Sequence, residues 1–480
     1  MKRYAWAAVG MGFLMVPASG SAAVSQASRI AHIEASLTPT LQVRGRPVTP
    51  RTLEQEMAAH HLPSISVAVV DHGKIVWAKA YGLADMAAKR PATVRTLYQA
   101  GSISKPVAAS GATKLIQEGR LALDVPANHQ LTSWQIPDNA FTKDRPVTLR
   151  HLLTHTGGLT VHGFPGYAAG KPVPSVVQVL EGKPPANTAA VVVERQPGTV
   201  WNYSGGGITI AQLMMTDVTH QPFPELMRQG VFAPVGMADS TYEQPPPLSR
   251  AAAAATGYLR NGAPVEGRFH TYPEMAAAGL WTTPTDLAKW AIALERAYNG
   301  ASSPLMSKAS AQSMLLAPGL GNWGLGIELG GSGRDFHFTH GGDDWGFKAN
   351  FMAWPDGGRA IVVMANGDDG MVVAVELMQA VAREYGWKGL EPTVIDAVAF
   401  SAAQAKEVAG SYGHGLATVS ADGSGLRLTY QGATVELLPQ GDDKFIADPG
   451  SANVLVKLAR GPDGQVKSLA AMGMTVPRDP

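Results

Sequence analysis

The stretch Gly101-Ser102-Ile103-Ser104-Lys105-Pro106 decides how the rest of this sequence is interpreted. Apolar residues follow it at helical spacing as far as Gly119, which predicts an amphipathic helix. Pro106 is compatible only with the first turn of a helix, so Ser102 is placed at the helix N-terminus. Because residues three apart share one helix face, the hydroxyl of Ser102 and the amine of Lys105 are expected to meet.

This pairing suggests chemistry. A serine hydroxyl is a weak nucleophile until a base takes its proton, and a desolvated lysine with a lowered pKa can be that base. The helix N-terminus also favours negative charge that develops during attack on a carbonyl. The pattern fixes only two positions, however, and it equally fits an N-capping serine beside a surface lysine. The rest of the chain has to decide between the two interpretations.

Composition excludes several classes of function. The chain has 480 residues, of which 45% are apolar and 16% charged, so it is long enough for two or three domains with a large core. Lys and Arg (39) balance Asp and Glu (38), which gives no electrostatic basis for binding nucleic acid or an anionic membrane. The absence of cysteine excludes a thiol nucleophile, thiolate metal ligands and disulfides.

The first residues have the pattern of a secretory signal. Lys2 and Arg3 precede an apolar run from Trp6 to Val16, and small residues follow up to Ala23. We expect residues 1–23 to be a signal peptide, with an uncleaved N-terminal anchor as the alternative. Cleavage would remove Lys2 and Arg3 and leave 37 basic and 38 acidic residues, so the mature protein would be close to neutral. The predicted location is the bacterial periplasm or the medium, with no integral membrane segment after signal removal.

The order of elements predicts an α+β fold for residues 24–386. Strand patterns lie near both ends of this region, and mainly helical sequence with long loops lies between them. One antiparallel sheet should therefore collect strands from both ends, with the helical part inserted. The predicted strands are Ile65 to Val70, Lys74 to Tyr81, Leu325 to Leu329, Phe336 to Thr339, Ala349 to Trp354 and Arg359 to Met364, and Val372 to Tyr385 is a closing helix.

The last part of the chain has a different pattern. Residues 387–399 are predicted to form a linker, and residues 400–480 contain six short alternating segments separated by turn signals such as Ala421-Asp422-Gly423. These segments indicate a small antiparallel sheet or barrel. None of its residues suggests catalysis.

One histidine pair and one glycine-rich stretch match the spacing of cofactor-binding motifs, but the residues around them argue against a cofactor site. His151 and His155 have the spacing of a zinc pair, but no Glu lies between them and the residues around them are typical of packing. Gly319 to Gly324 matches G-x-G-x-x-G, yet strands rather than a helix are predicted after it, so a glycine-rich strand entry is favoured. We therefore expect no metal and no organic cofactor.

Three further motifs follow Ser102 in order: Leu152 to Leu159 (LLTHTGGL), Tyr203-Ser204-Gly205, and His340-Gly341-Gly342. With Gly101 to Lys105, they make the sequence resemble the serine β-lactamase-like family, which includes class C β-lactamases, D-amino-acid peptidases and related esterases. The resemblance covers roughly residues 50 to 385. It implies a β-lactamase/transpeptidase-like core, and the C-terminal sheet resembles the lipocalin-like appendage of some members, where it restricts access or aids assembly.

The resemblance also implies roles for individual residues. Ser102 corresponds to the nucleophile, and Lys105 and Tyr203 to the pair that handles its proton. His340 stands where many relatives have the lysine of K-T-G, followed by Gly341 and Gly342. The backbone N–H groups of Ser102 and Asp343 would form the oxyanion hole.

Some of these residues also have ordinary structural interpretations. Trp345 could line the substrate cleft or be an exposed loop tryptophan. Tyr203 could simply pack its ring, and His340 could end a strand without contacting substrate. These alternatives stay open at the level of sequence.

Two departures from the family pattern bear on substrate. Gly205 replaces the asparagine of Y-x-N, which removes an amide from the substrate-binding side, and His340 is only partly charged near neutral pH. Both changes favour an esterase, amidase or peptidase over an efficient β-lactamase, whose substrates carry a carboxylate.

The predicted function is an exported serine hydrolase that forms an acyl-enzyme on a small-molecule or peptide substrate, either an ester or an amide, D-amino-acid peptides included. One alternative is β-lactamase or penicillin-binding DD-peptidase activity, and another is a non-catalytic relative that binds cell-wall peptide. The sequence contains no G-x-S-x-G, no H-E-x-x-H and no phosphate-binding G-x-x-x-x-G-K-[ST]. The sequence does not indicate an oligomeric state.

Overall fold

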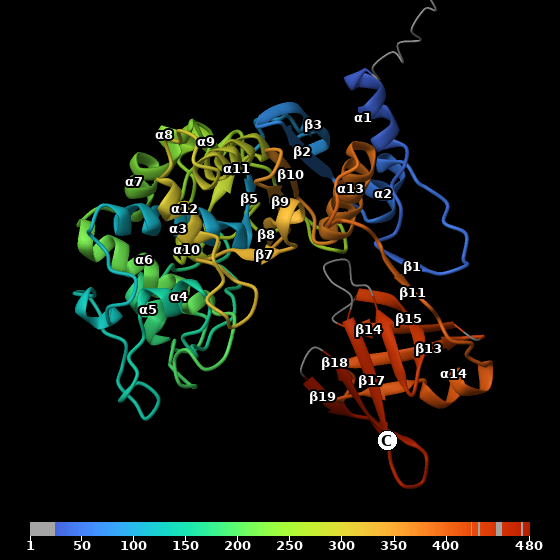
Figure 1. Ribbon diagram of the computed structural model, residues 1–480. Helices are drawn as coiled ribbons and strands as arrows, with labels where there is room; N and C mark the ends of the chain where they lie inside the picture. The colour runs from blue at the N-terminus through green and yellow to red at the C-terminus, as the bar shows by residue number, and fades with distance from the viewer. Residues whose placement is uncertain (1–24, 424, 431–432, 448–453, 472–473) are drawn as a thin grey trace, which may run out of the picture.

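The computed structural model describes residues 25–480 apart from 424, 431–432, 448–453 and 472–473. The expected signal peptide, residues 1–23, lies outside the described residues. Figure 1 shows a large body of helices around a sheet and, joined to it by a single connection, a smaller body of strands that carries the C-terminus. No helix in the described part of the chain has the length and hydropathy needed to cross a bilayer.

A seven-stranded antiparallel sheet forms the centre of the large body, and it draws strands from both ends of the region as the sequence predicts. The strand order across the sheet is β4-β3-β2-β10-β9-β8-β7. The strands are β2 (Ser64–Asp71), β3 (Lys74–Asp85), β4 (Arg90–Pro91), β7 (Glu328–Gly330), β8 (His337–Asp344), β9 (Phe347–Trp354) and β10 (Arg359–Ala365).

The central strands are buried on both faces, which explains their continuous apolar sequence. Val67 and Val69 of β2 belong to one hydrophobic cluster, while Ala68 and Val70 belong to the other, as the two-residue period of a strand requires. The first cluster is completed by α1 (Gln26–Glu34), α2 (Leu53–Ala59) and α13 (Gly370–Tyr385). The second is completed by the inserted helical part.

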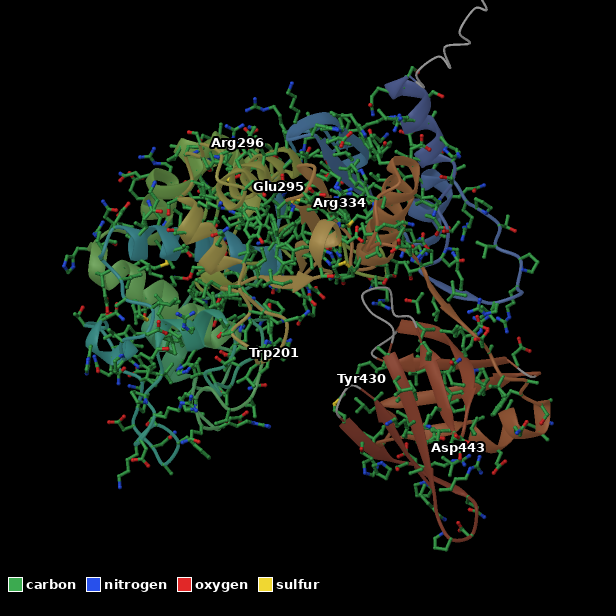
Figure 2. All side chains as sticks on the ribbon, in the orientation of Figure 1. Trp201, Glu295, Arg296, Arg334, Tyr430 and Asp443 are labelled. Carbon is green, nitrogen blue, oxygen red and sulfur yellow. The ribbon has the colours of Figure 1, made fainter. Side chains whose placement is uncertain are left out.

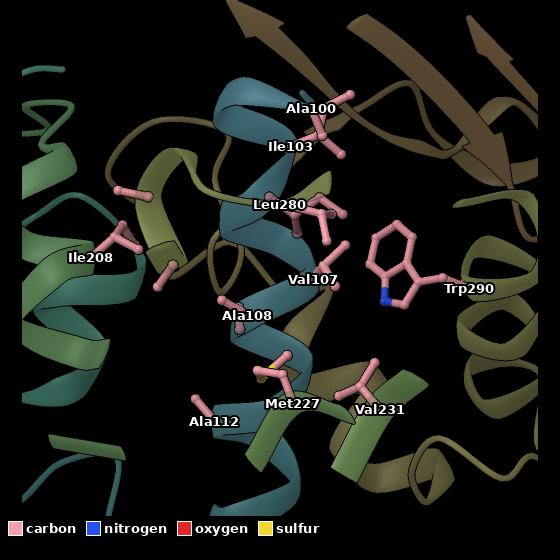
Figure 3. Packing of buried hydrophobic residues seen from close by; sticks show 14 of the residues in the cluster. Ala100, Ile103, Val107, Ala108, Ala112, Ile208, Met227, Val231, Leu280 and Trp290 are labelled. Atoms are coloured by element: carbon pink, nitrogen blue, oxygen red, sulfur yellow. The ribbon is translucent and has the colours of Figure 1, made fainter. Parts of the chain in front are cut away.

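The helix predicted after Ser102 is the centre of this second cluster. Ser102 itself lies in a 3₁₀ turn, η1 (Gly101–Ile103), and α3 (Ser104–Gln117) follows directly, with Pro106 in its first turn. Most of α3 is buried on all sides. Figure 3 shows Val107 and Ala112 of α3 packed among residues from other helices, including Met227 and Trp290.

The other helices surround α3 and the sheet. Two of them are long, α6 (Gly205–Thr219) and α11 (Pro284–Tyr298), and α11 is capped by Thr283 with Pro284 at its first position. Shorter ones are α4 (Leu149–Leu153), α5 (Val176–Glu181), α7 (Phe223–Met227), η3 (Arg228–Phe232), α8 (Ala233–Val235), α9 (Leu248–Ala251), α10 (Met275–Ala278) and α12 (Lys308–Met314). The pair β5 (Tyr98–Gln99) and β6 (Trp281–Thr282) joins the approach to η1 with the segment after α10.

The C-terminal body is an eight-stranded antiparallel sheet in simple chain order, and it is nearly closed into a barrel. An isolated bridge between Tyr412 and Arg478 brings its first and last strands together. The strands are β12 (Gly410–Tyr412), β13 (Ala417–Asp422), β14 (Gly425–Tyr430), β15 (Ala433–Gly441), β16 (Lys444–Ala447), β17 (Val454–Arg460), β18 (Val466–Ala471) and β19 (Met474–Pro477). The sequence missed β12, β19 and the short helix α14 (Ala402–Val408), because each has too few residues to show a period.

The segment predicted as a linker is partly structured. Within it β11 (Thr393–Ile395) pairs in parallel with β1 (Leu41–Val43) from the lead-in before the sheet. Pairing between segments about 350 residues apart leaves no local sequence signal, so only the folded chain reveals it.

Candidate active site

The turn that carries Ser102 is held tightly against strand β8. Gly101 has a φ of +51°, and a Cβ built on it would lie 2.5 Å from the backbone nitrogen of Asp343. A Cβ on Gly342 would lie 2.0 Å from the carbonyl oxygen of Ala100. Glycine is therefore required at both positions for the two segments to approach this closely. As a result, the backbone around Ser102 lies beside that of Asp343, the two residues expected to supply the oxyanion hole.

Lys105 lies three residues after Ser102, about one helical turn along, at the start of α3. Its side chain is almost completely buried, and its Nζ donates hydrogen bonds to Oγ of Ser102 and to the carbonyl oxygen of Ala277, each at 2.8 Å. Ala277 belongs to the short helix α10, so the amine is fixed from two sides. This contact favours the nucleophile interpretation over a capping serine beside a surface lysine.

Tyr203 immediately precedes the Ser204 cap of α6, which brings it from about 100 residues away in sequence to the same site. Nζ of Lys105 lies 5.0 Å from the centroid of its ring. On the other side the ring contacts the imidazole of His155, with a centroid distance of 4.3 Å. The hydroxyl makes no hydrogen bond to any described residue, and Tyr203 lines the cleft.

His155 comes from the LLTHTGGL motif and supports the tyrosine instead of binding metal. It is buried, and its Nδ1 accepts a hydrogen bond from the backbone N–H of Ser204 at 3.2 Å. Burial, and then the charge of Lys105, lower the pKa of His155 well below its usual range, so the ring is neutral. His151, which has the spacing of a zinc pair with His155, contributes its ring to the cap of α4. No group of three or more His, Asp or Glu residues in the described ranges could hold a metal ion.

His340 lies within β8 and not at its end, because the strand continues to Asp344. Its Nδ1 is 2.6 Å from the carbonyl oxygen of Gly341, and its ring is buried next to Trp323 at a centroid distance of 5.2 Å. Burial, followed by the charge of Lys105, lowers the pKa of His340 to about 3. The expectation of a partly charged histidine is therefore wrong, since this ring is neutral at physiological pH.

A cavity of about 610 Å³ lies over these groups. Its wall includes Ser102, Lys105, Tyr203 and the stretch His340 to Asp344. Sequence reasoning missed several residues of the wall. His162, Phe164, Arg260 and Trp323 come from loops, Glu328 begins β7, and Met371 lies in the first turn of α13. Trp323 lies inside the glycine-rich stretch Gly319 to Gly324, for which the sequence predicts only the entry to a strand.

One side of the cavity is aromatic. The rings of Tyr203 and Trp323 are 5.5 Å apart, and His162 lies 4.7 Å from Tyr203, each measured between centroids. Trp201, labelled in Figure 2, extends this group toward the solvent: it is 40% exposed and lies 5.8 Å from Trp323. Of these rings, that of Tyr203 lies over the Lys105 amine.

Another part of the wall is charged, and two of its cations are paired with aspartates. Lys348 forms ion pairs with Asp343 at 2.7 Å and with Asp368 at 3.1 Å, and Arg260 pairs with Asp369 at 3.1 Å. Asp344 is also buried here, where burial, and then the charge of Asp343, raise its pKa well above the usual range.

Among the described residues, two that the sequence proposed for substrate contact do not form part of the cavity wall. Trp345 stacks on His270 at a centroid distance of 5.7 Å and is 49% exposed, which agrees with the loop-tryptophan alternative. Gly205 is buried behind the wall. A Cβ there would lie 3.0 Å from both the carbonyl oxygen of His162 and the ring of Phe164, so these residues occupy the space next to it.

The Beta-lactamase family model matches residues 50–384, which include every one of these site residues. The chain belongs to this family. The resemblance inferred from the motifs is thereby confirmed, and the relatives it matches include an esterase and a putative penicillin-binding protein.

Individual relatives agree with this assignment. Esterase EstB of Burkholderia gladioli is 29% identical over 195 residues, which cover 39% of this chain and 48% of EstB. The putative penicillin-binding protein PbpX of Bacillus subtilis (strain 168) is 25% identical over 267 residues, 52% of this chain and 61% of PbpX. This chain thus spans only about half of the first relative and three fifths of the second.

The fold extends further than the sequence similarity. The structure of the octameric penicillin-binding protein homologue from Pyrococcus abyssi superposes with a TM-score of 0.61 at 22% identity, and the match covers 88% of this chain and 98% of that one. This agreement confirms the predicted α+β core with its C-terminal antiparallel sheet.

Proposed function

We propose that this protein is an exported serine hydrolase that forms an acyl-enzyme on ester or amide substrates, D-amino-acid peptides included. The observation that carries the proposal is the 2.8 Å contact between Nζ of Lys105 and Oγ of Ser102 inside a cavity large enough for a small substrate. A capping serine would instead direct its hydroxyl to a backbone N–H of its own helix.

In the proposed reaction Oγ of Ser102 attacks the substrate carbonyl carbon and loses its proton to the pair formed by Lys105 and Tyr203, which accepts it in the state where either the amine or the phenol is deprotonated. The negative charge on the carbonyl oxygen is stabilised by the backbone N–H groups of Ser102 and Asp343, which are fixed before the substrate arrives. The same pair then returns the proton to the leaving group. A water molecule deprotonated by the pair releases the acyl group from Ser102.

Covalent labelling tests this proposal. The purified protein is incubated with a fluorescent fluorophosphonate, beside a Ser102→Ala variant and beside a Ser110→Ala variant as a matched control. Ser110 lies on α3 as well, but its hydroxyl bonds to the carbonyl oxygen of Pro106 in the core. We expect label on the wild type and on Ser110→Ala but not on Ser102→Ala. Equal labelling of all three would reject Ser102 as the nucleophile.

A substrate panel then separates the alternatives. Turnover of a short-chain nitrophenyl ester, a D-alanyl nitroanilide and nitrocefin distinguishes esterase, peptidase and β-lactamase activity. A protein that takes up no label and hydrolyses none of the three, while still binding cell-wall peptide, would support the non-catalytic alternative.

A further inference from the structure

Lys348 places a buried ammonium group in the wall of the cleft. The residue lies on β9 directly opposite Asp343 of β8, and only 8% of it is exposed. Its Nζ donates to Oδ1 of Asp343 at 2.7 Å and to Oδ1 of Asp368 at 3.1 Å. A longer contact of 3.5 Å reaches the carbonyl oxygen of Asp344. One amine thus joins β8, β9 and the segment between β10 and α13.

This amine is charged, and it has two anionic partners. Although burial lowers the pKa of Lys348, the charges of Asp343 and Asp368 raise it overall, so the group stays an ammonium. The cluster of Lys348, Asp343 and Asp368 therefore has one positive and two negative charges, which gives a net charge of −1. Loss of the lysine would leave a net charge of −2 in the same wall.

The charge matters here because Asp343 is the residue whose backbone N–H is proposed to bind the carbonyl oxygen of the substrate. A carboxylate on the same residue lies close to the negative charge that develops on that oxygen and repels it. The side chain of Asp343 is 74% exposed, so water screens part of this repulsion. The ammonium of Lys348, only 2.7 Å from that carboxylate, opposes the rest.

We propose that Lys348 is a positioning residue of the oxyanion hole. Its ammonium fixes the side chain of Asp343 and offsets the negative charge that this side chain brings to its own N–H donor. The role requires no contact between the lysine and the substrate and no proton transfer. It rests on the proposed function, in which an oxyanion forms beside Asp343.

Removing the amine, first alone and then together with the carboxylate, tests the proposal. Lys348→Met should lower kcat for a nitrophenyl ester roughly tenfold with little change in KM, because the opposing charge develops only in the transition state. Lys348→Met combined with Asp343→Asn returns the cluster to a net charge of −1 and should bring kcat back to within about threefold of the wild type.

The combined variant distinguishes a charge effect from a structural one. If Lys348 only tied the three segments together, Asp343→Asn would restore nothing, because the ammonium is absent from both variants. An unchanged kcat in Lys348→Met, or no recovery in the folded combined variant, would overturn the proposal.

Lys289→Met is the matched control. The ammonium of Lys289 also pairs with a buried carboxylate, that of Asp286 at 2.8 Å, but both residues belong to α11 and neither is among the described residues of the cleft wall. Its kcat should stay within about twofold of the wild type. A tenfold loss here as well would reject a specific role of Lys348.

Asp343→Asn alone gives a test that does not depend on the folding of Lys348→Met. It changes the net charge of the cluster from −1 to 0 and should raise kcat roughly threefold. A salt bridge with only a structural role predicts the opposite, a decrease. A decrease or an unchanged kcat would overturn the proposal.

Binding to Ser102→Ala separates this inference from the proposed function. Phenylacetate and phenylacetamide have nearly the same shape and differ in charge, and tryptophan fluorescence follows their binding, since Trp323 lines the cleft. Adding Lys348→Met should weaken the binding of phenylacetate about tenfold more than that of phenylacetamide, and Asp343→Asn should reverse most of this difference.

This result would keep the charge role of Lys348 even if the wild type neither took up fluorophosphonate nor hydrolysed an ester, in which case the hydrolase proposal alone would fail. Equal weakening of the two compounds would reject the role of Lys348.

Discussion

The imidazole of His155 lies against the phenol ring of Tyr203, with centroids 4.3 Å apart and planes inclined by 32°. His155 is fixed by the backbone N–H of Ser204 and carries no charge, so it holds the tyrosine in place without adding a positive charge beside Ser102. The contact separates two functions of Tyr203: its ring fixes the geometry, and its hydroxyl faces the cleft. A substitution that removes only the hydroxyl therefore tests the chemistry alone.

We predict that Tyr203→Phe lowers kcat roughly 10²–10⁴-fold while leaving the thermal midpoint close to that of the wild type. The ring contacts with His155 and Trp323 remain, whereas the proton-transfer group is lost. Steady-state turnover of a nitrophenyl ester and a thermal melt measure the two effects. An unchanged kcat would show that Tyr203 only packs its ring.

Replacing Lys105 with methionine should abolish acylation without unfolding the chain. Methionine has a similar length and fills the buried space, but it can neither take a proton nor donate to Ser102 and Ala277. We expect fluorophosphonate labelling to slow at least about 100-fold, with the far-UV circular dichroism spectrum retained. Normal labelling of this variant would assign the base to another residue.

Gly342→Ala should destabilise the protein by roughly 1–3 kcal/mol, because the new methyl group would lie 2.0 Å from the carbonyl oxygen of Ala100 and backbone must move. Gly341→Ala is the matched control: the nearest atom to its Cβ is the methyl of Met371 at 3.8 Å. Its unfolding free energy should change by less than about 0.5 kcal/mol. Urea denaturation measures the unfolding free energy of both variants. Similar losses of unfolding free energy would contradict the close approach of β8 to the turn that carries Ser102.

Two tryptophans should differ in their effect on substrate binding. Trp323 lines the cavity next to Tyr203 and His340, so Trp323→Ala is expected to lower kcat/KM roughly tenfold or more. Trp345→Ala should leave kcat/KM within about twofold, since that ring stacks on His270 outside the cavity wall. The same ester assay measures both variants. A larger loss with Trp345→Ala would restore the alternative in which this side chain contacts the substrate.

Glu274 should make the stability of the fold depend on pH. It is fully buried before α10, and burial raises its pKa to about 8 from 4.5. The folded chain thus holds this proton more tightly than the unfolded chain. The resulting stabilisation is complete below about pH 4.5, decreases as the pH rises and is lost above about pH 8.

The variant Glu274→Gln removes this titration and keeps the size of the side chain. Between pH 5 and pH 9 the wild type should lose several kcal/mol of stability that the variant does not lose, with an upper limit of about 5 kcal/mol. Denaturation curves of both proteins at the two pH values give the loss of stability of each. The contributions of the other titrating groups cancel when the two losses are subtracted. Parallel losses in the two proteins would show that Glu274 is not the group responsible.

Much of the fold could be predicted from local patterns. The hairpin of β2 and β3, the capped start of α11 and most strands of the C-terminal sheet have periods or turn residues that lie within about ten positions of one another. Three features were not predictable, because they depend on distant partners or on too few residues. They are the pairing of β1 with β11, the first and last strands of the C-terminal sheet (β12 and β19), and the 3₁₀ form of the turn at Ser102.

The candidate site divides in the same way. By itself the sequence predicted the candidate nucleophile and its lysine, since a separation of three residues in a helical turn brings Ser102 and Lys105 together without help from the rest of the chain. Only the tertiary structure decided that His340 is neutral, that Lys348 and Arg260 are paired with aspartates, that Trp323 and not Trp345 lines the wall, and that His155 supports Tyr203. Charge state, pairing and exposure depend on burial and on neighbours brought from far away in the chain, and these arise only when the chain has folded.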